Sequence, residues 1–164
     1  MSNVKFKGES VKLNSNGLNV GDNALKVTLK AKDLSDVKIA EDGKTQIILS
    51  VPSLDTPVCA NEAREFNKKV ASYNAEVIVV SMDLPFAMGR FCSTEGIDNI
   101  VVASDFVKKE FGEKYGVLIA DSALEGLLAR AVFVIKDGKI AYKELVEEIT
   151  QMPNIEALES FLNK

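Results

Sequence analysis

Residues 45–59, "TQIILSVPSLDTPVC", place the signals for a strand, a tight loop and a helix start in immediate succession. The apolar run that closes at Pro52 is typical of a strand buried on both faces. Thr56 is a favourable N-cap, and Pro57 suits the first position of a helix. The stretch therefore predicts a central strand that passes through a short loop into a helix, with Cys59 in the first turn of that helix.

The predicted helix has one apolar face. Ala63, Phe66 and Val70 recur at helical spacing, and Cys59 lies on the same face. Arg64 follows Cys59 by five residues, which is about 140° around a helix. We expect Cys59 to point inward against the sheet and Arg64 to point to solvent.

A second apolar strand is predicted in "AEVIVVSMD", residues 75–83, and a short helix or turn in "LPFAMGRFCSTEG", residues 84–96. The second segment carries Cys92, the other cysteine of the chain. A strand, a helix and another strand in this order predict a parallel pair joined by a right-handed crossover.

The remaining segments complete the predicted fold. Asp137-Gly138 is the strongest hairpin signal, and Asn16-Gly17 is a weaker one near the N-terminus. Strands are expected in 25–34, 100–105 and on both sides of Asp137-Gly138, and helices in 106–117 and from Asn154 to the end.

This order of elements predicts an α/β chain with a thioredoxin-like fold. A central mixed sheet is flanked by helices, and a β-hairpin is added at the N-terminus. A flavodoxin-like sheet is the alternative, but the Asp-Gly hairpin counts against it because that fold is built from parallel strands. At 164 residues and 46% hydrophobic, we expect residues 1–164 to form a single domain.

The charge and the composition narrow the classes of partner. Lys and Arg number 20 against 24 Asp and Glu, and the basic residues are scattered, so we expect no nucleic-acid partner. The sequence has neither the apolar core of a secretory signal nor a run of about 18 apolar residues, so we expect no membrane partner. We infer a cytoplasmic protein.

The chain has no histidine and only two cysteines. The absence of histidine excludes Ser-His and Cys-His couples and zinc sites that contain histidine. Two cysteines are too few for a secreted disulfide scaffold, so the pair is either core packing or redox machinery. We expect no metal and no bound cofactor, and any cysteine chemistry must be activated without histidine.

Cys59 is the candidate nucleophile, because a thiol reacts as its thiolate and a helix start favours an anion. The helix dipole supplies about 0.3–1 kcal/mol, which is less than the roughly 1.36 kcal/mol of one pKa unit. A cation is therefore expected nearby, and Arg130, in an otherwise apolar strand, is assigned to Cys59. The Thr56 hydroxyl is expected to bond both a capping N–H and a polar group held at the sulfur, and Pro52 to shield the site and fix the loop.

Simpler structural interpretations exist for the same residues. Cys59 and Cys92 could be buried core thiols, since free cysteine is among the most buried residue types. Arg130 could pair with a surface carboxylate such as Asp121 or Glu125. Thr56 and Pro52 also serve adequately as a helix cap and a loop brace.

Pro52, Thr56 and Cys59 fit the Pro-x-x-x-Thr/Ser-x-x-Cys signature, and on these residues the chain resembles the peroxiredoxins. The stretches "DLPFAMGRFCSTEG" and "YGVLIADSALEGLLARAVFVI" resemble the thiol peroxidase subfamily, an atypical two-cysteine group. The resemblance covers nearly the whole chain. One position departs from it, because Met88 stands where glutamine is common.

The resemblance implies a peroxidase that reduces hydrogen peroxide and alkyl hydroperoxides. Cys59 is then the peroxidatic cysteine and Cys92 the resolving one, with Thr56 and Arg130 completing the site. The family also implies a homodimer and reduction by thioredoxin. A Cys59 sulfenic acid would condense with Cys92 into a disulfide, which needs local unwinding because the two Cα atoms must come within about 7 Å.

Two other functions fit parts of the sequence. A thioredoxin-type disulfide oxidoreductase needs a second cysteine in the same helical turn. Cys59 is the only cysteine among residues 58–62, which counts against this function. A redox sensor or chaperone would use the same disulfide to change its partner binding, and would react once instead of turning over.

Overall fold

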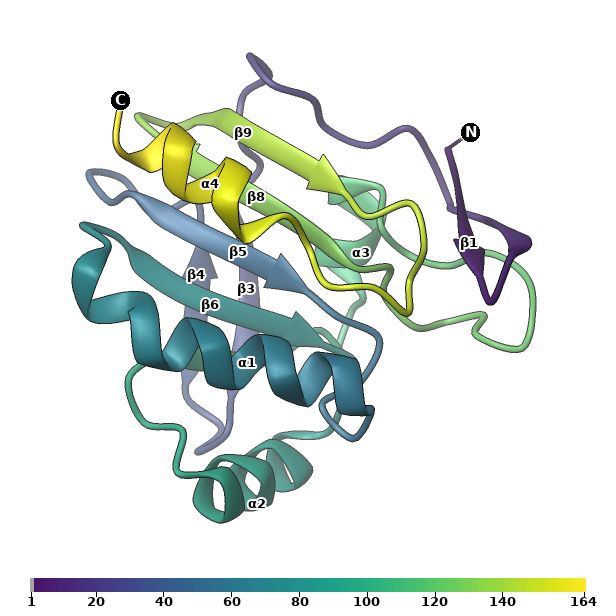
Figure 1. Cartoon of the computed structure of the whole chain (residues 1–164), viewed down its shortest axis with the longest axis horizontal. Coiled ribbons are helices and arrows are strands. Elements are labelled where there is room, and N and C mark those ends of the chain that lie inside the picture. The colour runs from purple at the N-terminus through teal and green to yellow at the C-terminus, as the bar shows by residue number, and fades with distance from the viewer. Residues whose placement is uncertain (1) are drawn as a thin grey trace.

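The computed structural model describes residues 2–164 and shows a mixed α/β architecture (Figure 1). A seven-stranded sheet has the order β4-β3-β7-β6-β5-β8-β9, and β1 and β2 form a separate pair. The strands are β1 Asn3–Phe6, β2 Glu9–Lys12, β3 Val27–Ala31, β4 Asp36–Ile39, β5 Gln46–Ser50, β6 Glu76–Ser81, β7 Val101–Ser104, β8 Ala131–Lys136 and β9 Lys139–Leu145. The helices are α1 Pro57–Lys69, the 3-10 turn η1 Val70–Ser72, α2 Pro85–Glu95, α3 Glu110–Tyr115 and α4 Ile155–Leu162.

The sheet combines parallel and antiparallel pairs. β5 and β6 are parallel, as are β6 and β7, whereas β8 runs antiparallel to β5 and to β9. The predicted strand-helix-strand unit is therefore present as β5-α1-β6, and the Asp137-Gly138 hairpin joins β8 to β9. Strand β8 lies inside the sheet, between β5 and β9, and is antiparallel to both, which rules out the flavodoxin-like alternative.

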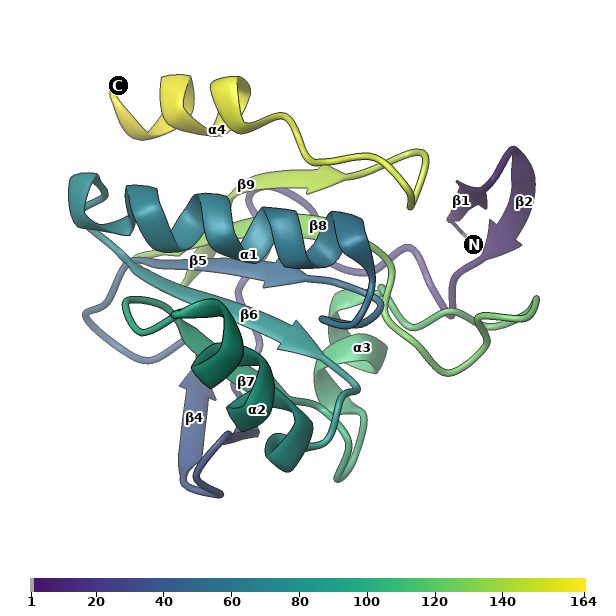
Figure 2. The ribbon, with the colours of Figure 1, turned by 60° about the horizontal axis from the view of Figure 1, so that its bottom comes forward.

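The central strands are buried on both faces because each face has its own core. Ile47 and Leu49 of β5 point into one cluster and Ile48 into the other, as strand alternation requires. Figures 1 and 2 show α1 and α4 on one face of the sheet and α3 on the other. Met88 of α2 packs in the same cluster as α1 and α4, so the departure from the family pattern at this position is a core contact.

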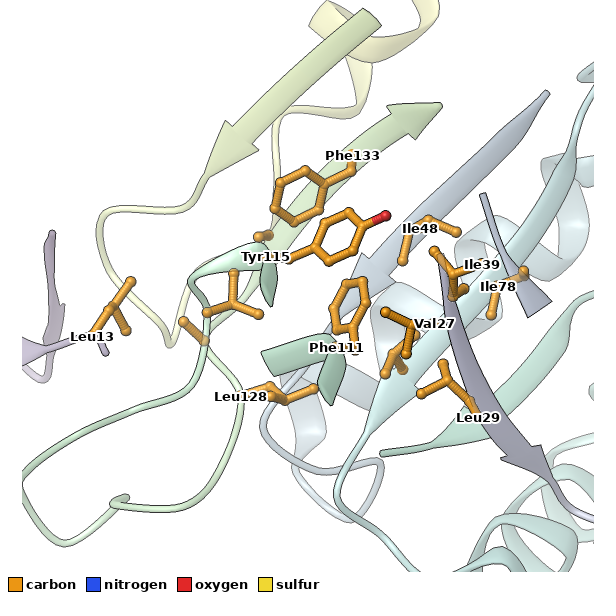
Figure 3. Close-up of a cluster of buried hydrophobic side chains, with 14 of the residues drawn as sticks. Leu13, Val27, Leu29, Ile39, Ile48, Ile78, Phe111, Tyr115, Leu128 and Phe133 are labelled. Atoms are coloured by element: carbon orange, nitrogen blue, oxygen red, sulfur yellow. The ribbon is translucent and has the colours of Figure 1, made fainter. Parts of the chain in front are cut away.

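Aromatic side chains pack in the core cluster that contains Ile48, between α3 and the sheet (Figure 3). Phe111 and Tyr115 stack at a centroid distance of 4.5 Å, and Phe133 of β8 meets both rings edge-on. The Tyr115 hydroxyl donates to the Leu25 carbonyl at 2.7 Å, which satisfies its polar end. These contacts fix α3 against the sheet on the side away from α1.

The N-terminal hairpin is present, but its predicted turn at Asn16-Gly17 is wrong. The turn lies at Lys7-Gly8, where both residues have positive φ, 51° and 85°. Gly17 serves a different contact: a Cβ there would lie 2.2 Å from the Tyr115 carbonyl oxygen. Glycine at position 17 therefore permits close packing of two segments and does not close a hairpin.

The helix predicted over 106–117 is shorter than expected. It begins at Glu110, because Lys109 has φ 56° and breaks the helical path, and it ends at Gly116 as predicted. The buried Asp105 carboxylate accepts from the backbone N–H groups of Phe111 and Gly112 at 3.0 and 2.8 Å and so caps the helix.

No helix within residues 2–164 is long and apolar enough to cross a membrane.

Candidate active site

The site is built at the start of α1, directly after the central strand β5. Thr56 is the N-cap with extended backbone, φ −91° and ψ 147°, and its side chain accepts from the Cys59 backbone N–H at 3.4 Å. The same hydroxyl donates to the Ser53 carbonyl at 3.0 Å, which closes the loop. Pro52 is buried at the beginning of this loop, and Cys59 is fully buried. The sequence correctly predicted the cap and the inward direction of the thiol.

Arg130 lies one residue before β8 and reaches Cys59 across the core. Its Nη2 is 3.1 Å from Sγ of Cys59, and its Nε donates to the Ile149 carbonyl at 2.9 Å. The guanidinium is 1% exposed, so no water screens the contact with the sulfur. The structure therefore brings together the two residues that the sequence paired.

A third residue of the site, Glu62, escaped the sequence prediction. Its Oε1 accepts from Nη1 of Arg130 at 2.6 Å, and the pair is almost fully buried. Glu62, not Asp121 or Glu125, is the carboxylate partner of Arg130. A signal was present, because Glu62 follows Cys59 by three residues and so lies on the inward face of the helix.

The electrostatics of Glu62 differ from those of a surface carboxylate. Burial raises the pKa of Glu62 to about 7, against the opposing effects of the Arg130 charge and hydrogen bond, and the charge of Glu144 adds to the rise. Its Oε2 is buried and has no hydrogen-bond partner among residues 2–164. The site thus contains a carboxyl group that titrates near neutral pH beside the guanidinium that contacts Cys59.

Asp83 joins the Cys59 loop to the end of β6. Its carboxylate accepts from Ser53 Oγ and from the Leu54 backbone N–H, each at 2.7 Å, and from Ser81 Oγ at 2.8 Å. Pro85 begins α2 only two residues later. Asp83 therefore fastens the loop before α1 to the strand that leads into α2.

Cys92 lies on α2, on the face turned to the core. Its side chain is 3% exposed, and it belongs to the same core cluster as Cys59. Both cysteines are free thiols in this structure. Burial raises the pKa of the Cys92 thiol, and the charge of Lys32 only partly offsets the effect.

Two further contacts hold α2 against α1. Arg64 forms an ion pair with Glu95, three residues beyond Cys92, and the Arg64 side chain is 37% exposed as expected for a partly solvated position. The Asn67 side-chain oxygen accepts from the backbone N–H groups of Asp98 and Asn99. The C-terminal end of α2 is therefore attached to α1, the helix that carries Cys59 in its first turn.

In the described part of the chain, no other place that could bind a metal ion or a small molecule includes the residues of the Cys59 site. Residues 2–164 contain no group of three His, Cys, Asp or Glu side chains placed to hold a metal ion. Two surface hollows of about 780 and 660 Å³ are lined by residues other than those of the Cys59 site. The buried group around Cys59 is thus the best-defined chemical site in the part of the chain that the structure describes.

Known proteins share this sequence and this fold. Residues 19–159 match the Redoxin family. A thiol peroxidase from Campylobacter jejuni is 77% identical over 162 residues, covering 98% of this chain and 93% of that protein. A thiol peroxidase from Aquifex aeolicus is 52% identical over 155 residues, covering 92% and 90%.

Solved structures agree with the sequence relatives. The crystal structure of a peroxiredoxin-like protein from Aquifex aeolicus superposes with a TM-score of 0.94 at 46% identity, covering 99% of this chain and 96% of that one. A thiol peroxidase from Chromobacterium violaceum gives a TM-score of 0.89 at 21% identity, covering 98% and 95%, which is a likeness of fold alone. These matches confirm the thioredoxin-like fold. By sequence and by structure, the chain belongs to the Redoxin family, and within it to the thiol peroxidases of the peroxiredoxin type.

Proposed function

We propose that residues 1–164 act as one domain that reduces hydrogen peroxide and alkyl hydroperoxides at Cys59. The observation that carries this proposal is the 3.1 Å contact between Sγ of Cys59 and Nη2 of Arg130 at the start of α1. Both the guanidinium and the helix start favour the thiolate, which is the reactive form of cysteine.

The first step is attack of the Cys59 thiolate on one peroxide oxygen. The S–O bond forms as the O–O bond breaks, and the second oxygen leaves with the electron pair of that bond. This oxygen takes a proton and departs as water or an alcohol, while Cys59 becomes a sulfenic acid. Arg130 stabilises the charge on the leaving oxygen, Thr56 holds the helix start that presents Cys59, and Pro52 shields the sulfur from water.

The second step is condensation of the Cys59 sulfenic acid with the Cys92 thiol. A disulfide forms and one water molecule leaves, so the two electrons that reduced the peroxide come from the two cysteines. Both thiols are buried in this structure, and bridging them requires α2 to unwind locally. Unwinding also exposes Cys92 to water and so removes the burial that disfavours its thiolate.

A dithiol protein must then return two electrons to the disulfide, and thioredoxin is the reductant that we propose. The family assignment supports this choice and supports a homodimer as the working form. A thioredoxin-dependent cycle needs a reducing compartment, which favours a location in the cytoplasm.

The test is peroxide consumption by the purified chain with thioredoxin, thioredoxin reductase and NADPH. Cys59→Ser is expected to abolish the reaction. Cys92→Ser is expected to react once and then stop, because the sulfenic acid has no resolving thiol. Steady turnover by Cys59→Ser would refute the assignment, and a wild-type chain that reacts once and stays oxidised would point to a redox sensor.

A further inference from the structure

The buried site contains two potential anions and one cation. Arg130 contacts Sγ of Cys59 through Nη2 and Oε1 of Glu62 through Nη1, and its Nε is occupied by the Ile149 carbonyl. Cys59, Glu62 and Arg130 are each 1% exposed or less. If Cys59 and Glu62 were ionised together, the group would keep one net negative charge away from water, which is costly.

The burial of Glu62 and its incomplete hydrogen bonding favour its neutral form when Cys59 is a thiolate. Only Oε1 has a donor, and Oε2 is buried without a partner. The charged groups that act on Glu62 directly are Arg130, from the start of β8, and Glu144 on β9, and Cys59 on the same helix shares the Arg130 guanidinium with it. Of these, only Arg130 stabilises a carboxylate, and it is shared with the sulfur. Cys59 and Glu62 therefore compete for one cation.

We propose that Glu62 holds a proton while Cys59 is a thiolate and gives it up as the thiolate is oxidised, so that Arg130 always faces one anion. This inference rests on the proposed peroxidase function and adds a role for Glu62 to it. Glu62 acts on the sulfur through Arg130, and is therefore a positioning residue and a proton store.

Protons and electrons balance in the oxidation step when Glu62 is the proton donor. The thiolate, the neutral carboxyl and the hydroperoxide give the sulfenic acid, the carboxylate and the alcohol or water. One S–O bond forms, one O–O bond breaks, sulfur is oxidised and the peroxide is reduced. The proton released by Glu62 offsets the proton taken by the leaving oxygen, and the charge of the site is the same before and after.

Few other groups could balance this proton inside the site. The chain has no histidine, and Asp83 already accepts three hydrogen bonds at the loop. When the thiolate becomes a neutral sulfenic acid, Arg130 would lose the one anion that it faces. Ionisation of Glu62 at that moment restores a full ion pair at the 2.6 Å contact that already exists.

The experiment counts protons during a single oxidation. Cys92→Ser stops the reaction at the sulfenic acid, and hydrogen peroxide is mixed with it at pH 6 in weakly buffered solution containing an indicator dye. Absorbance at 240 nm measures the thiolate consumed in the same reaction. We expect almost no proton uptake per thiolate in Cys92→Ser and about one in Cys92→Ser/Glu62→Gln. The matched control, Cys92→Ser/Glu65→Gln, alters another carboxylate of α1 and should behave like Cys92→Ser.

A second condition tests the proposal without altering Glu62. At a pH high enough to ionise Glu62 while Cys59 is a thiolate, the same Cys92→Ser protein should take up about one proton per thiolate, so the uptake should rise from almost none as the pH is raised above 6. Uptake of about one proton at pH 6, unchanged by Glu62→Gln, would overturn the proposal while leaving the peroxidase function intact. If peroxide consumes no thiolate at all, the proposed function itself fails.

Discussion

Nη2 of Arg130 lies 3.1 Å from Sγ of Cys59, although the two residues are 71 positions apart in the sequence. The contact exists because β8 pairs with β5, which brings Arg130 to the same end of the sheet as the loop that follows β5. The sheet therefore supplies the cation and the helix start supplies the thiol. The chemistry of the site depends on this junction.

Arg130→Lys tests whether the shape of the guanidinium matters as well as its charge. Arginine donates to Cys59, Glu62 and the Ile149 carbonyl from three nitrogens, and a single ammonium cannot reach all three. We expect peroxide to react with Cys59 roughly 10²–10³-fold more slowly, by analogy with loss of an oxyanion donor.

Stopped-flow mixing with hydrogen peroxide measures this rate, and Arg64→Lys is the matched control on the solvent side of α1. A rate within a few-fold of wild type in Arg130→Lys would show that positive charge alone is sufficient.

The sequence was enough to place the thiol and its cation. A helix start is predicted by Thr56 and Pro57, and Cys59 falls in its first turn. An arginine within an apolar strand requires an anionic partner, which points to Arg130. Glu62 could not be predicted as readily, because a glutamate is almost never fully buried unless it is paired, and its partner Arg130 is 68 residues away in the sequence. Asp83 was missed because its partners come from a different segment, and hydrogen bonds between segments leave no periodic signal.

Asp83→Asn tests the attachment of the Cys59 loop. Three donors point at this carboxylate, and an amide would place its own N–H₂ against one of them. We expect the free energy of unfolding to fall by about 1–3 kcal/mol. Urea denaturation measures it, with Asp55→Asn as the control for an exposed aspartate of the same loop. Equal stability of the two variants would argue that solvent replaces the three bonds.

The stability of the protein should depend on pH through Glu62. Burial raises the pKa of Glu62 from 4.5 to about 7, so between these values the folded chain binds more protons than the unfolded chain. The contribution of Glu62 to stability is therefore full below about pH 4.5 and declines as the pH rises towards 7.

Urea denaturation of wild type and Glu62→Gln from pH 4.5 to 8 isolates this contribution. Burial also raises the pKa of Asp105, to about 6, but that group is common to both proteins. The decline should be smaller in Glu62→Gln, and identical pH profiles would contradict the buried, protonated carboxyl.

The ion pair between Arg64 and Glu95 should slow the unwinding of α2 that the proposed disulfide requires. Both side chains are partly exposed, at 37% and 29%, so the pair contributes about 0.2–1 kcal/mol. Arg64→Glu should therefore speed Cys59–Cys92 disulfide formation by up to about fivefold.

The charge-swapped Arg64→Glu/Glu95→Arg should return that rate towards wild type. Rapid acid quench after addition of peroxide, followed by separation of reduced and oxidised protein, measures the step. If the single and the swapped variants are equally fast, the effect comes from side-chain packing and not from the charges.

The parts of the fold that local patterns predicted poorly depend on contacts between distant segments. Gly17 resembles a hairpin residue, but its conformation serves the close approach to Tyr115. The hairpin turns at Lys7-Gly8 instead, where the Glu148 carboxylate accepts from both backbone N–H groups. Strong periodic segments such as β5 and β8 were predicted well because burial on both faces leaves a continuous apolar run.

Peptide mass spectrometry after one equivalent of hydrogen peroxide shows directly which cysteine attacks the peroxide. We expect a Cys59–Cys92 disulfide peptide in the wild-type chain. In Cys92→Ser we expect a single added oxygen on the peptide that contains Cys59, trapped as its dimedone adduct. An added oxygen on Cys92 with Cys59 left reduced would contradict the account, because the thiol beside Arg130 would then not be the one that attacks peroxide.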